Sequence, residues 1–305
     1  MAKSILSVPH FQDEKAAFAY VEAHLWPKGP VCPFCRETAR VGRMNGRTTR
    51  QGLCKCYACQ KPFTVRMGTI FESSHLPLHM WLQAIHLMCA SKKRISTRQM
   101  QRTLQCSMKT AWHLTHRIRE TMKPRVEGMG GTGEIIEADT TCVGRKAGRK
   151  LGPARTPMNS VFALVEREGR VRSFHVPNIQ AHTLHNAIEK AEVDRVSLLY
   201  TDEANTFVDI IGKTFASHET VNHSIDEYVC GNVHTNSVEG FFSILKRGVY
   251  GTYQHVSEHH LHRYLTEFDF RYANREARKI DDALRAKIAL RGAKGRRLTY
   301  ETTRS

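Results

Sequence analysis

Three acidic residues occupy positions at which carboxylates from distant parts of a chain can meet. Asp139 lies near the end of a predicted buried strand at 134–141, and Asp202 lies two residues beyond the apolar strand at 196–200. Between them the pattern predicts two further strands and a helix, at 159–165, 171–176 and about 182–192. If the first and fourth of these strands are neighbours in the sheet of an α/β domain, the two carboxylates come together.

A third acid is expected from the helix predicted over 234–247. Its buried stripe consists of apolar residues at helical spacing, Val238, Phe241, Phe242, Leu245 and Val249. Glu239 and Lys246 are seven residues apart and therefore lie on nearly the same side of the helix, beside that stripe. This pattern places Glu239 at the edge of the core, with Lys246 two turns away.

Three convergent carboxylates suit a pair of hard cations. Phosphodiester transfer with two Mg²⁺ ions about 3.5–4 Å apart uses one ion at the attacking oxygen and the other at the leaving oxygen. Mg²⁺ prefers oxygen ligands and keeps part of its water shell, so a few carboxylates satisfy it. We therefore expect Mg²⁺ (or Mn²⁺) at Asp139, Asp202 and Glu239, and Lys246 on a substrate phosphate.

Each acid also has a purely structural interpretation. Asp202 could cap the next helix, and Asp139 could be an ordinary strand-end acid. Glu239 could belong to a capping box headed by Asn236. If Glu239 is not the third ligand, the candidates to replace it are Glu137 and His234.

Four cysteines form two Cys-x-x-Cys pairs that are separated by twenty residues: Cys32, Cys35, Cys56 and Cys59. Two such knuckles place four thiolates around one structural Zn²⁺. A segment this small cannot fold on an apolar core alone, so the metal would supply its folding energy. Cys54 is a further nearby thiol, but Cys54-Lys-Cys56 makes a poorer knuckle, and we leave it out of the ligand set.

Residues 76–123 have the pattern of three helices. Pro77 suits the first turn of one helix. Ser96 and Ser107 can cap the next two, which a short turn joins as in a helix-turn-helix. The residues then expected to face a DNA groove are Lys109, Thr110, His113 and Arg117. An ordinary helical connector fits the same pattern.

The charge balance points to a polyanionic partner. The 305 residues carry 46 Lys+Arg against 29 Asp+Glu, a formal charge of +17, and 41% of them are apolar. For a chain with enough apolar residues for a core, nucleic acid is the usual partner of such a charge. No apolar run reaches the roughly 18 residues of a membrane span, and the N-terminus lacks the apolar segment of a secretory signal. Nine cysteines, four of them in knuckles, fit a reducing cytoplasm better than a disulfide framework.

The sequence predicts a multidomain chain. Its expected parts are an N-terminal helical segment over 1–30, the zinc ribbon over 31–67 and the helix-turn-helix over 76–123. An α/β catalytic domain with a mixed sheet flanked by helices is expected over 132–275, and a basic tail over 276–305 in which a helix gives way to a disordered end. The glycine-rich stretch at 128–133 suits a linker. The loop at 144–157 is either a DNA-contacting loop or a solvated hairpin, and its candidate contacts are Arg145, Lys146, Arg149 and Lys150.

Taken together, these motifs resemble the insertion-sequence DDE transposases that carry an N-terminal zinc ribbon and an RNase H-like catalytic domain. The resemblance covers about residues 15–275. Its most specific marks are CPFC, CYAC, KTAWHLTHRIR, EADTT, LYTDE, VNHSIDEYV and HTNSVEGFFSILKRGVYGTY. It implies that the first and fourth strands are neighbours, as in the RNase H-like layout. It also implies a triad of Asp139, Asp202 and Glu239, with Lys246 as the basic residue seven positions further on. Some family members carry Asn at the third position, so the full acidic triad is intact here.

The resemblance also implies what such a chain does. A transposase binds the terminal inverted repeats of its element in double-stranded DNA, cleaves strands to a 3′-OH, and joins that end to target DNA. Because two ends must be held together, it implies a homo-oligomer, in the cytoplasm of a bacterium and associated with its nucleoid. The competing hypotheses are a zinc-ribbon regulator without catalysis, an RNase H-like nuclease or resolvase that cuts but does not join, and an inactive relic.

Overall fold

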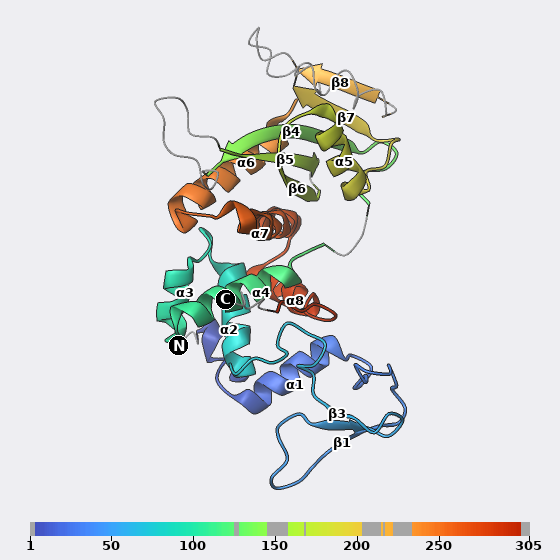
Figure 1. Ribbon diagram of the computed structural model, residues 1–305, viewed down its shortest axis with the longest axis vertical. Helices are drawn as coiled ribbons and strands as arrows, with labels where there is room; N and C mark the ends of the chain where they lie inside the picture. Colours follow the sequence, from blue (N-terminus) through green and yellow to red (C-terminus); the bar gives the residue numbers. More distant parts are fainter. Residues whose placement is uncertain are drawn as a thin grey trace, which may run out of the picture. The chain divides into compact units, whose positions relative to one another are not determined.

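The computed structural model describes residues 4–124, 128–144, 158–167, 169–202, 215, 217–221 and 234–299. The chain forms two compact units, one of Met1–Met122 together with Ile280–Ser305 and one of Lys123–Lys279, and each is described by itself (Figure 1). Among the described helices, none combines the length and the apolarity that crossing a membrane requires.

The first unit begins with a helix and a small sheet. Helix α1 (Glu14–Leu25) starts at Asp13, whose carboxylate accepts a hydrogen bond from the Ala16 amide at 2.7 Å. Two 3-10 turns precede it, η1 (Ile5–Ser7) and η2 (Pro9–Phe11). The sheet is antiparallel, in the order β1 (Val41–Arg43), β2 (Cys54–Cys56) and β3 (Pro62–Phe63).

Three helices follow the ribbon: α2 (Leu78–Ala90), α3 (Thr97–Leu104) and α4 (Met108–Thr121). The Ser96 hydroxyl caps α3 by accepting from the Gln99 amide at 3.2 Å, and Ser107 caps α4 by accepting from the Thr110 amide at 3.1 Å. Both predicted helix starts are confirmed, because each rests on a local hydrogen bond that the sequence itself encodes.

The basic C-terminal segment contains a helix, as predicted, but this helix is docked against the rest of the first unit. It is helix α8 (Asp282–Arg291), which packs against α2 and buries Ala289 and Leu290. Arg285 is 7% exposed and donates to the Cys89 carbonyl at 2.9 Å. Beyond α8, the Gly295 amide donates to the Gly68 carbonyl at 2.8 Å. A few well-spaced apolar side chains therefore dock this segment despite its high charge.

The second unit is built on a five-stranded mixed sheet in the order β6-β5-β4-β7-β8. The strands are β4 (Ile135–Val143), β5 (Asn159–Glu166), β6 (Val171–Val176), β7 (Leu198–Asp202) and β8 (Ser217–Val221). The central strand β4 pairs antiparallel with β5 and parallel with β7. The two strands that carry Asp139 and Asp202 are therefore neighbours, as predicted. The edge strand β8 was not predicted.

Helices cover both faces of this sheet (Figure 1). They are α5 (Ala181–Ala191), α6 (Asn236–Gly248) and α7 (Leu261–Ala273), with short turns η6 (Val249–Tyr253), η7 (Glu258–His260) and η8 (Glu276–Arg278). Ile136 and Ala138 of β4 pack in the cluster of α5, whereas Val143 packs in the cluster of α6 and α7. Because side chains alternate along a strand, Glu137 and Asp139 belong to the face that α6 and α7 cover.

Candidate functional site

Asp139 and Asp202 occupy corresponding positions on neighbouring parallel strands. The ladder between β4 and β7 runs as far as Ala138 opposite Thr201. The next residue of each strand is an acid, Asp139 on β4 and Asp202 at the end of β7. Neighbouring strands lie about 4.8 Å apart, so this register sets the two acid-bearing backbone positions side by side. The Asp139 side chain is half-buried.

Helix α6 carries the third acid. Its apolar side chains Val238, Phe241, Phe242 and Leu245 are buried against the sheet. Glu239 and Lys246 are exposed on the same helix. The Thr235 hydroxyl donates to Glu239 Oε1 at 3.2 Å. The pattern of buried stripe and flanking charged residues on this helix is the predicted one.

The capping-box interpretation of Glu239 is wrong. Asn236 is the first residue inside α6, and Thr235, which precedes it, makes no side-chain cap. The amides of Ser237 and Val238 instead donate to Glu137 Oε2 of β4, at 2.7 and 3.1 Å. The first-turn amides of Ser237 and Val238 are therefore capped from another element, and no capping box is headed by Asn236.

Glu137 and His234 were the alternative third ligands. Glu137 is completely buried, and besides the two amides it accepts from Arg167 Nε at 3.1 Å. His234 Nδ1 lies 3.2 Å from Arg167 Nη2 and 3.6 Å from Glu137 Oε1. A carboxylate surrounded by so many donors is poorly placed to bind an exposed cation.

The donor set of the three acids fits Mg²⁺. All three would offer carboxylate oxygens, the ligand type that this ion prefers. Asp139 is half-buried and Glu239 exposed, so water and a phosphate would have access to both. Sequence reasoning missed the role of Glu137, although its period-two spacing from Asp139 shows that they share a face.

The four knuckle cysteines form a compact cluster in the first unit. Their sulfur atoms, of Cys32, Cys35, Cys56 and Cys59, all lie within 4.8 Å of one another. Sγ of Cys32 is 3.7 Å from that of Cys59, and Sγ of Cys35 is 3.6 Å from that of Cys56. Thiolates about 2.3 Å from a tetrahedral Zn²⁺ would be about 3.8 Å apart, so the residues fit this ion.

The neighbouring thiols differ in their environments. Hydrogen bonding from the Cys59 amide is the main factor that lowers the pKa of Cys56, to about 7, against the effect of burial. Cys54 is also buried, but it is not part of the four-sulfur cluster. Burial raises the pKa of the Cys54 thiol. Leaving Cys54 out of the ligand set agrees with this geometry.

The predicted DNA-facing residues of α4 separate into two groups. Lys109 is exposed, and Thr110 and His113 are half-buried near the start of the helix. Arg117 is only 5% exposed, and its Nη2 donates to the Glu72 carbonyl at 2.6 Å. Its guanidinium lies over the Trp81 ring at 5.3 Å. Arg117 therefore belongs to the core of the first unit and not to a DNA-facing surface, which corrects the prediction.

The predicted loop contacts Arg145, Lys146, Arg149 and Lys150 lie outside the described residues. The same is true of residues 222–229, which make up most of the VNHSIDEYV motif. The side chain of Asp202 also lies outside the described residues, and only its backbone position at the end of β7 is described.

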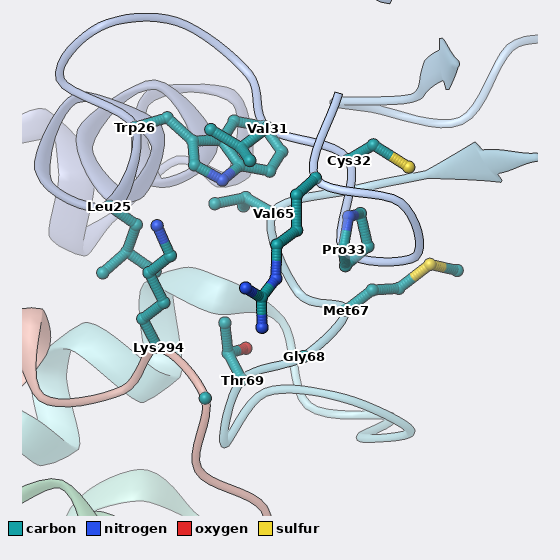
Figure 2. A pocket seen from close by; sticks show the side chains of 12 residues that line it. Leu25, Trp26, Val31, Cys32, Pro33, Val65, Met67, Gly68, Thr69 and Lys294 are labelled. Carbon is teal, nitrogen blue, oxygen red and sulfur yellow. The ribbon is translucent and has the colours of Figure 1, made fainter. Parts of the chain in front are cut away.

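A cavity of about 480 Å³ lies beside the zinc ribbon in the first unit. Figure 2 shows Trp26, Val31 and Val65 on its wall together with Lys294 from the C-terminal segment. Arg36 also lines it, and none of the lining residues is acidic. The cavity adds a basic, partly apolar hollow to the ribbon.

Comparisons with known proteins match both units. Residues 131–273 match the ISXO2-like transposase domain, and residues 12–62 match the transposase zinc-ribbon domain. A relative in Halobacterium salinarum, described as an uncharacterized protein in transposable element ISH50, is 26% identical over 288 residues. That alignment covers 88% of this chain and 93% of the relative.

Two solved structures are similar at low scores. A pre-cleavage Mos1 transpososome is 13% identical with a TM-score of 0.25, covering 70% of this chain and 78% of that one. A simian T-cell lymphotropic virus intasome in complex with the PP2A regulatory subunit B56 gamma is 18% identical with a TM-score of 0.23, covering 39% of this chain and 47% of that one. Because these TM-scores are low, the fold is inferred from the sheet order of this chain alone.

Proposed function

Because the chain belongs to the ISXO2-like DDE transposases with an N-terminal zinc ribbon, which are polynucleotidyl transferases, we propose that it cleaves strands at the ends of its element and joins the 3′-OH to target DNA. One observation carries this proposal. Asp139 and Asp202 directly follow opposed residues of adjacent parallel strands, on a sheet that the Glu239 helix covers.

In this proposal the three acids hold the divalent ions and Lys246 holds a substrate phosphate. When bound, Mg²⁺ supplies charge neutralisation at the attacking and leaving oxygens. Asp139, on the central strand, would serve both ions, and Asp202 and Glu239 would each serve one. Lys246, exposed two turns along α6, offers a positive charge near the scissile phosphate.

The first unit is proposed to recognise DNA. The zinc ribbon and the start of α4, with the exposed Lys109 and the half-buried Thr110 and His113, would contact the terminal inverted repeats. Arg145, Lys146, Arg149 and Lys150 would add phosphate contacts, which hold DNA without reading its sequence. A homo-oligomer would hold two ends together. We place the protein in the cytoplasm at the nucleoid; its archaeal relative gives no reason to restrict it to bacteria.

The test is a two-stage assay on duplexes that carry the terminal repeat. With Mg²⁺, the wild type should release a 3′-OH end and then produce strand-transfer products in a plasmid. Asp139→Asn should reduce cleavage by about 10³-fold or more while end binding stays within about twofold. Glu134→Gln, at an exposed position before β4, is the matched control.

Each outcome separates one hypothesis from another. Cleavage that survives Asp139→Asn would exclude the proposed chemistry. Cleavage without joining would indicate a nuclease or resolvase. Specific binding without any metal-dependent cleavage by the wild type would favour a regulator or an inactive copy.

A further inference from the structure

Glu137 is a buried acid in the second unit to which the proposed chemistry gives no task. Its side chain is 0% exposed and lies two residues before Asp139, on the same face of β4. A buried carboxylate is costly unless hydrogen bonds and opposite charge compensate it. Its partners therefore show what its burial achieves.

One oxygen of Glu137 caps helix α6. The amides of Ser237 and Val238 both donate to Oε2, at 2.7 and 3.1 Å. First-turn amides have no partner within their own helix, and the helix dipole favours a negative charge at this end. The cap comes from a residue 100 positions earlier in the chain, so it fixes the start of α6 directly on β4. Glu239 follows Val238 in the chain.

The other oxygen of Glu137 binds Arg167. Nε and Nη2 of Arg167 each lie 3.1 Å from Oε1. Arg167 Nη2 also donates to the His234 carbonyl at 3.2 Å, just before α6. The Arg167 guanidinium lies over the ring of Tyr200 at 5.3 Å. Tyr200 is opposite Glu137 in the β4–β7 ladder and lies two residues before Asp202.

The Glu137–Arg167 pair thus contacts all three acid-bearing elements at a residue one or two positions before the acid. Glu137 is itself part of β4, Arg167 contacts Tyr200 of β7, and Glu137 accepts from the amides of Ser237 and Val238 of α6. We propose that this ion pair is a positioning device, which fixes the separations of Asp139, Asp202 and Glu239 without binding the ions. This inference rests on the proposed function.

The pair can be removed without leaving a buried charge. Replacing a buried ion pair by apolar side chains of similar volume is often neutral for stability. Glu137→Met with Arg167→Met removes both charges and the cap, whereas Glu137→Gln with Arg167→Gln keeps an oxygen that can accept from the two amides. The matched control is Glu166→Met with Arg170→Met, because Glu166 is also buried and bonds Arg170 at 2.8 Å. Glu166 also accepts from the Gly130 amide, and by alternation along β5 it belongs with Phe162 and Leu164 to the face that α5 covers.

Two measurements are made on the full chain. The first is amide hydrogen exchange of Ser237 and Val238, which needs neither metal nor activity. The second is the rate of end cleavage as a function of Mg²⁺ concentration. In the Met pair we expect exchange at these amides to rise about tenfold, the cleavage rate to fall about 100-fold, and the Mg²⁺ midpoint to rise about tenfold. The Gln pair should recover most of each change, and end binding should stay at the wild-type level in all variants.

The outcomes keep this inference distinct from the proposed function. Wild-type exchange at Ser237 and Val238, or a wild-type Mg²⁺ midpoint, in the Met pair would overturn it, as would equal effects in the Glu166–Arg170 control. If the Met pair does not fold, Glu137→Asp tests the same idea, because its shorter side chain withdraws from the amides but keeps its charge. If Asp139→Asn cleaves DNA as fast as the wild type, the proposed chemistry is wrong. The hydrogen-exchange result at Ser237 and Val238 would not be affected by that outcome.

Discussion

Ala138 of β4 and Thr201 of β7 lie opposite one another in a parallel ladder, and each is followed in the chain by an acid. In parallel pairing, corresponding residues on the two strands stay level with one another. The register therefore carries Asp139 and Asp202 to the same height at one edge of the sheet. These two acids, with Glu239 on helix α6, are the proposed ligands of the divalent ions.

This geometry predicts where a redox-active ion would damage the chain. If Fe²⁺ replaces Mg²⁺ in the presence of ascorbate and peroxide, hydroxyl radicals form at the bound ion and cut nearby backbone. We expect the backbone to be cut near residues 139, 202 and 239. Excess Mg²⁺ should suppress all three cuts, because it competes with Fe²⁺ for the site. Mass spectrometry of the fragments measures this.

The control for that experiment is Glu219→Gln, at an exposed position on the edge strand β8. It should leave the cutting pattern unchanged, whereas Glu239→Gln should weaken every cut. Cuts confined to a single element would mean that the three acids do not share ions.

Local chemistry explains which parts of the structure the sequence could predict. Ser96 and Ser107 mark helix starts because each hydroxyl bonds an amide three residues later. The neighbouring positions of β4 and β7 were expected from the resemblance to the RNase H-like layout. The sheet order also agrees with the RNase H-like domain expected for this family.

What could not be predicted depends on contacts between distant residues. Glu137 caps a helix that begins about 100 residues later, and nothing near position 137 indicates this. Arg117 lies on a basic, polar helix, yet it is buried against Trp81. The edge strand β8 is short, and its sequence, SHETV, has only one apolar residue, so no apolar pattern indicated it.

The cysteine cluster predicts which thiols hold the metal. Cys35→Ser should reduce zinc from one ion per chain to near zero and unfold the ribbon, because the metal provides its folding energy. Cys54→Ser makes the same substitution at a buried cysteine outside the cluster, and this variant should keep the zinc. Elemental analysis of the purified variants measures both, and full zinc content in Cys35→Ser would contradict the ligand set.

Lys109 and Arg117 should behave differently when each is replaced by Ala. Arg117→Ala removes a buried hydrogen bond to Glu72 and the contact with Trp81, so it should lower the free energy of unfolding by about 1–3 kcal/mol. Lys109→Ala alters an exposed position and should weaken discrimination among end sequences without changing stability. Denaturant unfolding and competition binding measure the two effects. Equal stability losses would contradict the burial of Arg117, and a uniform loss on all DNA would make Lys109 a phosphate contact.

Asp269 of α7 predicts a pH dependence of stability. Burial raises its pKa to about 7 from the ordinary value of 3.8, although Ser173 donates to it from its amide at 2.9 Å and its hydroxyl at 2.6 Å. The folded chain therefore keeps this proton up to about pH 7, whereas the unfolded chain releases it near 3.8. The contribution of Asp269 to stability is thus complete below pH 3.8, declines as the pH rises, and is lost above about 7.

Asp269→Asn should flatten that dependence, because the amide does not titrate and can still pair with the Ser173 hydroxyl. The free energy of unfolding of the full chain, followed from pH 4.5 to pH 8, should decline less in this variant than in the wild type. Asp194→Asn, at an exposed position, is the control and should keep the wild-type slope. A slope in Asp269→Asn equal to that of the wild type would mean that Asp269 does not hold its proton in the folded state.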